Sequence, residues 1–266
     1  MLASDRELPV SGGPEKRAYV RDVFTAIAPT YDRLNRIISL RCDQRWRRYA
    51  VGRLGWERRP DGIYLDLCAG TLDFAATLAR RPGFRGRIVA ADFVPAMLRL
   101  GRDKAAGLAP VTADALELPF PDASFDGAMV GWGVRNLVDL DAGLAEAARV
   151  LRPGGRLVLQ EPMAGPVQPP IFPLMWARDA AASFLRTPEE MRALIEAAGF
   201  AARAWDDVTA EAAGPSTGAV TPSHSIQRIV MGEGLDEITR AGRRNREEQR
   251  IVTVQAVFVR SEDSRC

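Results

Sequence analysis

The sequence is poor in cysteine and histidine, with three cysteines and one histidine in 266 residues. Cys42, Cys68 and Cys266 form no C-x-x-C pair and leave one thiol over, which argues against a disulfide framework and against structural zinc. We therefore expect no metal site. An excess of one charge is also absent, because 36 basic residues face 34 acidic ones. No general field attracts nucleic acid or an anionic membrane, and neither is expected as a partner.

Long hydrophobic runs are missing as well. No stretch approaches the roughly 20 apolar residues that cross a bilayer, and no signal-peptide pattern is recognised at the N-terminus. We expect a cytoplasmic protein without an integral membrane segment. The length suits one α/β domain with additions, large enough to bury a substantial core.

What the chain does contain is an alternation of strand and helix patterns. Apolar residues recur at helical spacing over 19–54, interrupted by Pro29. The order of elements predicts an α/β fold with a doubly wound, mostly parallel seven-stranded sheet, N-terminal helices and a C-terminal strand pair. We expect strands at 63–68, 87–91, 111–112, 125–131, 156–160, 201–208 and 251–260, and helices at 73–81, 95–105, 140–151 and 188–198.

The domain organisation follows from composition and from this order. Residues 1–16 carry Ser, Gly, Pro and charges without a period, and we interpret them as a flexible tail. Residues 17–260 are expected to form a single domain. Within it we place helices at 17–56, a ligand-binding core at 62–161 and covering segments at 162–250.

The most informative stretch runs from Gly62 to Asp92. A strand leads into the small-residue turn Cys-Ala-Gly-Thr at 68–71, and a helix follows. Small side chains let backbone N–H groups approach a ligand, and a helix start favours negative charge. Asp92 stands about twenty residues past the turn, the spacing at which a carboxylate accepts both hydroxyls of a ribose. The stretch predicts half of a site for an adenosine-containing cofactor.

The turn favours a cofactor without phosphates. A dinucleotide fold places G-x-G-x-x-G under a pyrophosphate, whereas only Gly70 stands at an equivalent place here, so a nicotinamide dehydrogenase is disfavoured. Asp66 could meet a cationic amino group, and Asp114 follows a third strand, where it could reach an adenine amino group. Each acid alone is equally well a helix cap or a surface charge, but three acids at successive strand ends favour binding.

Longer stretches resemble one family. They lie between about Glu15 and Glu161 and are similar to the C-methyltransferases of ubiquinone and menaquinone biosynthesis: VRDVFTAIAPTYDRLNRIIS, LDLCAGT-x-D, ALELPFPDASFD, GVRN and RVLRPGGRLV. Those enzymes are class I S-adenosylmethionine-dependent methyltransferases with a Rossmann-like fold. The resemblance implies S-adenosyl-L-methionine as cofactor, with the turn around its methionine portion, Asp92 on the ribose and Asp114 at the adenine. The cofactor residues that it implies are Asp66, Cys68, Ala69, Gly70, Thr71, Asp73, Asp92, Phe93, Met97, Asp114, Ala115 and Gly131.

The same resemblance places Tyr31, Arg135 and Asn136 in the acceptor pocket. A guanidinium at Arg135 would stabilise a phenolate-like acceptor and lower its pKa, with water or a neighbouring group taking the proton. The alternative for Arg135 is a salt bridge to Asp139 or Asp141 at the start of the next helix.

The sequence leaves two interpretations open for His224 and for the apolar run at 171–176. His224, the only histidine, lies in TPSHSIQR and is either a general base or an ordinary surface residue. The apolar run at 171–176 lines the acceptor site, or it forms ordinary core or a dimer contact, so a homodimer stays open.

The chain also departs from the family. Leu72 stands where the family has the last glycine of its turn, and we hypothesise altered or weakened cofactor affinity. A histidine ahead of Trp46 and a tyrosine-rich segment before the last helix are absent, and the chain differs from Thr209 onward. The cofactor half therefore follows the family more closely than the acceptor half.

These observations predict an S-adenosylmethionine-dependent methyltransferase. The expected acceptor is a small aromatic, quinol-like or isoprenoid-linked molecule, methylated at carbon. The alternatives are O- or N-methylation of a specialised metabolite, and a methyltransferase-like protein that uses the cofactor for a non-methylating reaction. A nucleic-acid methyltransferase is disfavoured by the charge balance and by the lack of an Asn/Asp-Pro-Pro-aromatic run after the fourth strand.

Overall fold

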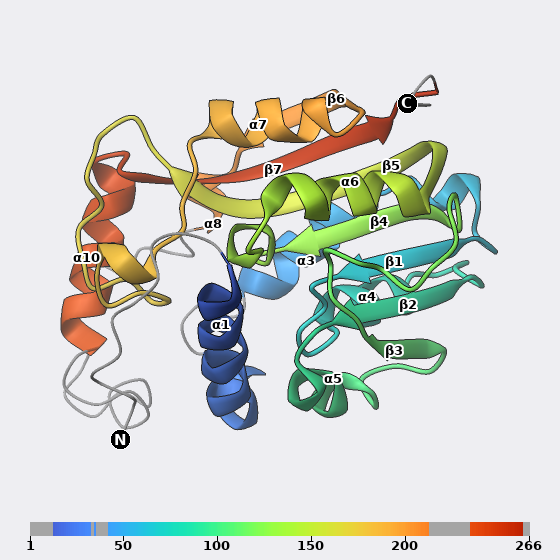
Figure 1. Cartoon of the computed structure of the whole chain (residues 1–266), viewed down its shortest axis with the longest axis horizontal. Helices are drawn as coiled ribbons and strands as arrows, with labels where there is room; N and C mark the ends of the chain where they lie inside the picture. The colour runs from blue at the N-terminus through green and yellow to red at the C-terminus, as the bar shows by residue number, and fades with distance from the viewer. Residues whose placement is uncertain (1–12, 33–34, 36–41, 213–234, 263–266) are drawn as a thin grey trace.

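The computed structural model describes residues 13–32, 35, 42–212 and 235–262, and Figure 1 shows the course of the chain. Within these residues, seven strands form one sheet in the order β3-β2-β1-β4-β5-β7-β6. Strands β1 to β5 run parallel, and β7 lies antiparallel between β5 and β6. The strands are β1 Ile63–Leu67, β2 Arg87–Asp92, β3 Leu108–Thr112, β4 Phe125–Gly131, β5 Leu151–Ala164, β6 Phe200–Asp207 and β7 Ile251–Arg260.

The predicted fold class is confirmed by this topology, which combines a doubly wound parallel sheet with a C-terminal antiparallel strand pair. No helix in the described part of the chain is long and apolar enough to cross a membrane. The helices, with η marking short 3₁₀ helices, are α1 Pro14–Ile27, η1 Ala28–Thr30, α3 Cys42–Arg53, η2 Trp56–Arg58, α4 Asp73–Ala79, α5 Pro95–Gly101, η3 Val134–Asn136, α6 Leu140–Val150, η4 Ala180–Ala182, α7 Pro188–Ala197, α8 Thr209–Ala212 and α10 Leu235–Glu247.

Each face of the sheet carries its own apolar cluster, because side chains alternate along a strand. On β1, Leu65 and Leu67 pack with apolar residues of α6 and α7, whereas Tyr64 packs with α3 and α4. Figure 1 shows α6 in front of the sheet and α3 behind it. Burial on both faces accounts for the nearly continuous apolar runs of the central strands.

Helix α1 begins at Pro14, so residues 14–16, which we expected in the tail, are helical. Proline suits the first helical position because it has no N–H to leave unpaired. Lys16 is buried at 7% exposure and fixes this end of the helix to η3. Its Nζ donates to the carbonyl oxygens of Arg135 and Leu137, at 3.2 and 2.6 Å.

Strand β5 begins at Leu151 and is longer than the expected 156–160, because β7 pairs with it from Arg156 to Ala164. Beyond this strand, the segment 165–186 crosses the same end of the sheet as α1. Helix α10 holds the segment through Asn245, which accepts from the backbone N–H of Ile171 and donates to its carbonyl oxygen, both at 2.7 Å. Figure 1 places α1 and α10 at this common end.

Candidate active site

The turn between β1 and α4 has three residues with positive φ, namely Cys68 at 53°, Gly70 at 53° and Leu72 at 64°. Glycine adopts this left-handed conformation freely, whereas it costs a leucine about 1–2 kcal/mol. Two backbone hydrogen bonds hold the turn in place. Leu72 N–H donates to Ala69 O at 2.8 Å, and Ala69 N–H donates to Ala91 O at 3.0 Å.

The side chain of Leu72 is fully buried in the apolar cluster that α3 and α4 form on the sheet. It approaches Gly101 of α5, where an added Cβ would lie 2.8 Å from Leu72 Cδ1 and 2.3 Å from the Thr71 carbonyl oxygen. The side chain therefore fills the core beneath the turn and is not part of the pocket lining.

Asp92, at the end of β2, turns back onto this turn. Its Oδ2 accepts from Gly70 N–H and its Oδ1 accepts from Val94 N–H, each at 2.8 Å. Burial raises the pKa of Asp92, and the two N–H donors oppose that rise. The carboxyl group is thus fixed in one orientation at the strand end, where it borders a pocket.

That pocket lies at the carboxyl ends of β1, β2 and β4 and is covered by α1, and the empty space within it and at its open mouth amounts to about 730 Å³. Figure 1 shows α1 beside the tip of β4. The predicted residues that line it are Tyr31, Cys68, Asp92, Phe93, Asp114, Ala115, Gly131 and Asn136. Lining residues that the sequence analysis missed include Arg17, Val20, Phe24, Trp132 and Leu137.

The remaining predicted cofactor residues stand behind this lining. Asp66 faces α4, because Leu65 and Leu67 occupy the other face of β1, and its Oδ2 accepts from Ala75 N–H at 2.8 Å. Burial raises the pKa of Asp66 well above its ordinary value. The predicted cofactor residues outside the lining are Asp66, Ala69, Gly70, Thr71, Asp73 and Met97, and the predicted acceptor residue Arg135 is outside it as well.

Asp114 closes the pocket toward β3. Its Oδ1 accepts from Leu116 N–H at 3.1 Å, and its Oδ2 lies 2.6 Å from Nη2 of Arg17 on α1. Arg17 and Asp114 both line the pocket. The ion pair therefore joins the covering helix to the edge of the site where the adenine was expected.

Arg135 lies beside the pocket in η3 and is 5% exposed. Its Nη1 donates to Oε1 of the fully buried Glu161 at 2.6 Å and to the Trp132 carbonyl oxygen at 2.8 Å. The structure thus pairs Arg135 with Glu161 instead of Asp139 or Asp141, and Asp139 accepts from Ala142 N–H as the cap of α6.

Two indole rings enclose the same guanidinium. Its Cζ lies 5.7 Å from the ring centroid of Trp132 and 5.0 Å from that of Trp176, within the range of cation–π attraction. Nε of Arg135 is buried and has no hydrogen-bond partner among the described residues. An unsatisfied buried donor is costly, so it is a candidate contact for a ligand oxygen.

Tyr31 and Asn136, which the sequence resemblance places in the acceptor pocket, both line this pocket. Burial raises the pKa of Tyr31, against the opposing charges of Arg47 and Arg135. The neutral phenol is therefore a hydrogen-bond donor at neutral pH. Asn136 Nδ2 donates to the Trp132 carbonyl oxygen at 3.4 Å, so the same backbone oxygen orients both Arg135 and Asn136.

His224 lies outside the described residues. Glu161 was missed by the sequence analysis, although it is the single acid in the apolar run LVLQEP of β5. An acid in such a run needs a buried partner, and this signal could have paired it with Arg135.

The sheet order, the strand-end pocket and its acids define a class I methyltransferase fold. The crystal structure of the [4+2]-cyclase SpnF superposes with a TM-score of 0.69 at 17% identity, covering 95% of this chain and 99% of that one. Geranyl diphosphate C-methyltransferase from Streptomyces coelicolor superposes with a TM-score of 0.63 at 16% identity, covering 82% of this chain and 79% of the other.

The chain belongs to the ubiE/COQ5 methyltransferase family, whose model matches residues 13–172. It is 42% identical over 167 residues to the ubiquinone/menaquinone biosynthesis C-methyltransferase UbiE of Geobacter sulfurreducens, a match that covers 59% of this chain and 63% of that protein. It is 49% identical over 144 residues to the demethylmenaquinone methyltransferase of Thermus thermophilus, covering 52% and 64% respectively. The chain thus spans less than two thirds of the length of these relatives.

Proposed function

We propose that the protein transfers a methyl group from S-adenosyl-L-methionine to a carbon of a small aromatic, quinol-like or isoprenoid-linked acceptor. The observation that carries the proposal is the strand-end pocket, which Asp92, Asp114, Tyr31 and Asn136 all line. Family membership, with relatives named as C-methyltransferases, supports the same reaction.

The residues of the pocket fit this cofactor. Asp92 is buried, held by two N–H groups and aimed along the strand-end edge, as a ribose diol requires. Asp114 stands one strand further on, suited to an adenine amino group. No phosphate-binding glycine loop is present in the turn, which favours a cofactor without a pyrophosphate. The remaining predicted residues would support the turn from behind.

On the acceptor side, the cofactor supplies an electrophilic methyl group, and the protein supplies alignment and exclusion of water, worth roughly 7–11 kcal/mol. The neutral phenol of Tyr31 would donate to an acceptor oxygen. The unpartnered Nε of Arg135 would offer a second, charge-assisted donor. Because Glu161 neutralises much of the guanidinium charge, Arg135 would orient the acceptor more than it lowers the acceptor's pKa.

Two alternatives are retained. O- or N-methylation of a specialised metabolite is favoured by the part of the chain after residue 172, which the family model does not match. A non-methylating reaction is the second, since a [4+2]-cyclase has this fold. Crowding of the cofactor by Leu72 would favour such a reaction, but the Leu72 side chain is buried in the core.

Thermal shift and product mass test the proposal. At about a hundred times its dissociation constant a ligand stabilises a protein by roughly 2.7 kcal/mol, which a thermal shift detects. We expect a shift with S-adenosylmethionine and S-adenosylhomocysteine and none with NAD. Incubation with demethylated quinols should add the mass of one methylene to the acceptor and release S-adenosylhomocysteine. A shift with NAD alone would refute the proposal.

The binding partners of the protein and its location in the cell follow from the same interpretation. We propose a small-molecule substrate, no nucleic acid and a cytoplasmic protein, with a homodimer as the open question that the mass in solution decides. The pocket supports the first two of these, because it lies at the strand ends under α1 and the only cation among its described lining residues, Arg17, is paired with Asp114.

A further inference from the structure

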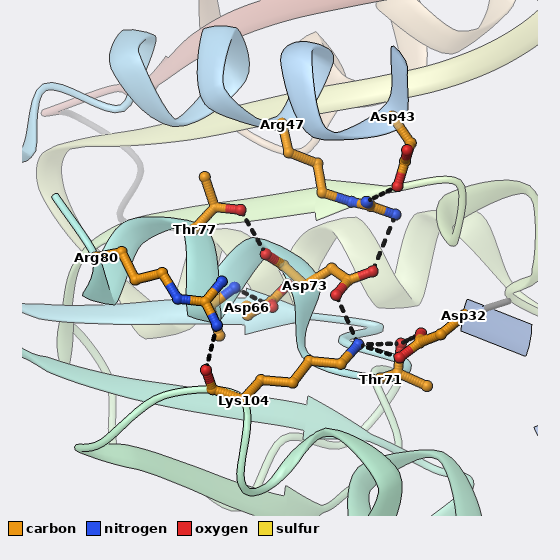
Figure 2. A network of polar contacts seen from close by, with 10 residues as sticks. Asp32, Asp43, Arg47, Asp66, Thr71, Asp73, Thr77, Arg80 and Lys104 are labelled. Atoms are coloured by element: carbon orange, nitrogen blue, oxygen red, sulfur yellow. Dashed lines mark hydrogen bonds and ion pairs between the residues drawn. The ribbon is translucent and has the colours of Figure 1, made fainter. Parts of the chain in front are cut away.

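Lys104 joins two segments that lie far from it in the sequence, one at Asp32 and the other at Thr71 and Asp73. Its Nζ lies 2.7 Å from Asp32 Oδ2, 2.6 Å from Asp73 Oδ1 and 3.0 Å from Thr71 Oγ1 (Figure 2). Asp32 follows η1, Thr71 belongs to the cofactor turn and Asp73 begins α4. The Lys104 side chain is 14% exposed, so one largely buried ammonium group uses all three donors in these contacts.

Asp32 makes the second link of the same junction. While its Oδ2 faces Lys104, its Oδ1 accepts from the hydroxyl group of Thr71, which is 2% exposed. A single carboxylate thus ties the end of the N-terminal helical segment to the cofactor turn, directly through Thr71 and indirectly through Lys104. Asp32 is also the immediate neighbour of Tyr31, which lines the pocket.

Arg47 of α3 closes the network from the other side. Its Nη2 lies 3.3 Å from Asp73 Oδ2, and its Nη1 pairs with Asp43 (Figure 2). The network therefore continues from Lys104 through Asp73 to Arg47, so that α3 is joined to the same junction.

We propose that Asp32 and Lys104 are positioning residues of the cofactor site. Neither lines the pocket. They act through Thr71, which fixes the turn, and through Tyr31, whose backbone they hold against it. The rest of the cover, Val20 and Phe24 of α1, is continuous with this anchored segment through η1. The inference rests on the proposed function for the identity of the ligand.

The physical consequence is a coupling between docking of α1 and ligand binding. If α1 is docked in only a fraction of the molecules, only that fraction binds the ligand. The apparent affinity is then the intrinsic affinity multiplied by this fraction. Weakening the junction should therefore lower affinity for S-adenosylhomocysteine even though no contact with the ligand is removed. It should also let the backbone of 14–32 exchange its amide hydrogens faster.

The test uses Asp32→Asn, which keeps the shape of the side chain, and measures hydrogen–deuterium exchange together with calorimetric titration of S-adenosylhomocysteine. We expect faster exchange in 14–32 and an affinity about tenfold weaker. Lys104→Met should act in the same direction, and the double variant should be little worse than either single variant, because both remove one junction. The control is Asp22→Asn on the same helix, whose carboxylate is 55% exposed and pairs with its neighbour Arg21.

Unchanged amide exchange of residues 14–32 in Asp32→Asn would overturn the inference. It would also be overturned if the fold-losses in affinity of the two single variants multiplied in the double variant. Amide exchange is measured on the protein without ligand. It therefore tests whether the junction anchors residues 14–32 independently of which ligand binds. A wild-type protein that binds no S-adenosylhomocysteine would instead contradict the proposed function. Faster exchange with unchanged affinity would limit Asp32 to structure and overturn the positioning role.

Discussion

The carboxyl group of Asp92 accepts a hydrogen bond at 2.8 Å from the backbone N–H of Gly70, 22 residues earlier in the chain. The end of β2 thereby fixes the turn that follows β1. Gly70 has a positive φ of 53°, so its N–H is directed toward the neighbouring strand end. One acid is thus proposed both to shape the turn and to hold the ribose of the ligand that the turn surrounds.

Asp92→Asn should weaken S-adenosylhomocysteine binding by about 10- to 100-fold, because hydrogen bonds to a charged acceptor are worth roughly 1.5–3 kcal/mol. Isothermal titration calorimetry measures the change. Asp103→Asn is the matched control, since its carboxylate is 93% exposed and is not part of the lining. Equal affinities in the two variants would show that Asp92 does not contact the ligand.

Glu161→Gln should destabilise the fold by about 3–5 kcal/mol, because it leaves the guanidinium of Arg135 buried without its counter-ion. Urea denaturation followed by tryptophan fluorescence gives the value and also reports on Trp132 and Trp176, which enclose that group.

The control for this variant is Glu196→Gln, which breaks the exposed pair between Arg192 and Glu196 on α7. Exposed pairs of this spacing are worth about 0.3–0.5 kcal/mol. A loss in Glu161→Gln no larger than in the control would contradict the buried pair.

Lys16 should give the fold a distinct pH dependence. Burial, and secondarily the charge of Arg186, lowers the pKa of Lys16 from 10.5 to about 8. Between about pH 8 and 10.5 the unfolded chain therefore binds more protons at this residue than the folded chain does. The contribution of Lys16 to the free energy of unfolding accordingly rises with pH across that window. Across this window the free energy of unfolding of the wild type should rise by up to ~3 kcal/mol relative to that of Lys16→Met. A difference that stays flat in urea denaturation over this range would show that Lys16 titrates normally.

Leu72→Gly should leave the affinity for S-adenosylhomocysteine within about twofold while lowering stability by about 2 kcal/mol. Deleting a fully buried leucine side chain costs about 2–5 kcal/mol, and release of the left-handed conformation offsets only about 1–2 kcal/mol of that loss. Calorimetry and thermal unfolding measure the two quantities. A large gain in affinity would mean that the side chain does crowd the cofactor after all.

The sheet was predictable because its signals are local. The central strands and β7 are apolar runs, so β4 and β7 were placed with their observed bounds. The start of α1 was not predicted, because Pro14 and Lys16 have the composition of a tail. In the structure, Lys16 donates to the carbonyl oxygens of Arg135 and Leu137, and these contacts hold the start of the helix. Long-range partners of this kind leave no periodic mark in the sequence.

The pocket was predictable only in part for the same reason. Strand-end acids such as Asp92 and Asp114 follow from topology, since parallel strands end at one edge. Asp66 also lies at this edge, but the alternation of side chains along β1 directs it toward α4. The partnership of Arg135 with Glu161 depends on the adjacency of β4 and β5, which spacing alone did not reveal.

The central claim is that the strand-end pocket holds the nucleoside of S-adenosylmethionine, and a crystal structure with S-adenosylhomocysteine tests it most directly. The account predicts both ribose hydroxyl groups within about 3 Å of the Asp92 carboxylate, with the adenine beside Asp114. A nucleoside bound elsewhere, or one whose sugar leaves Asp92 untouched, would contradict it.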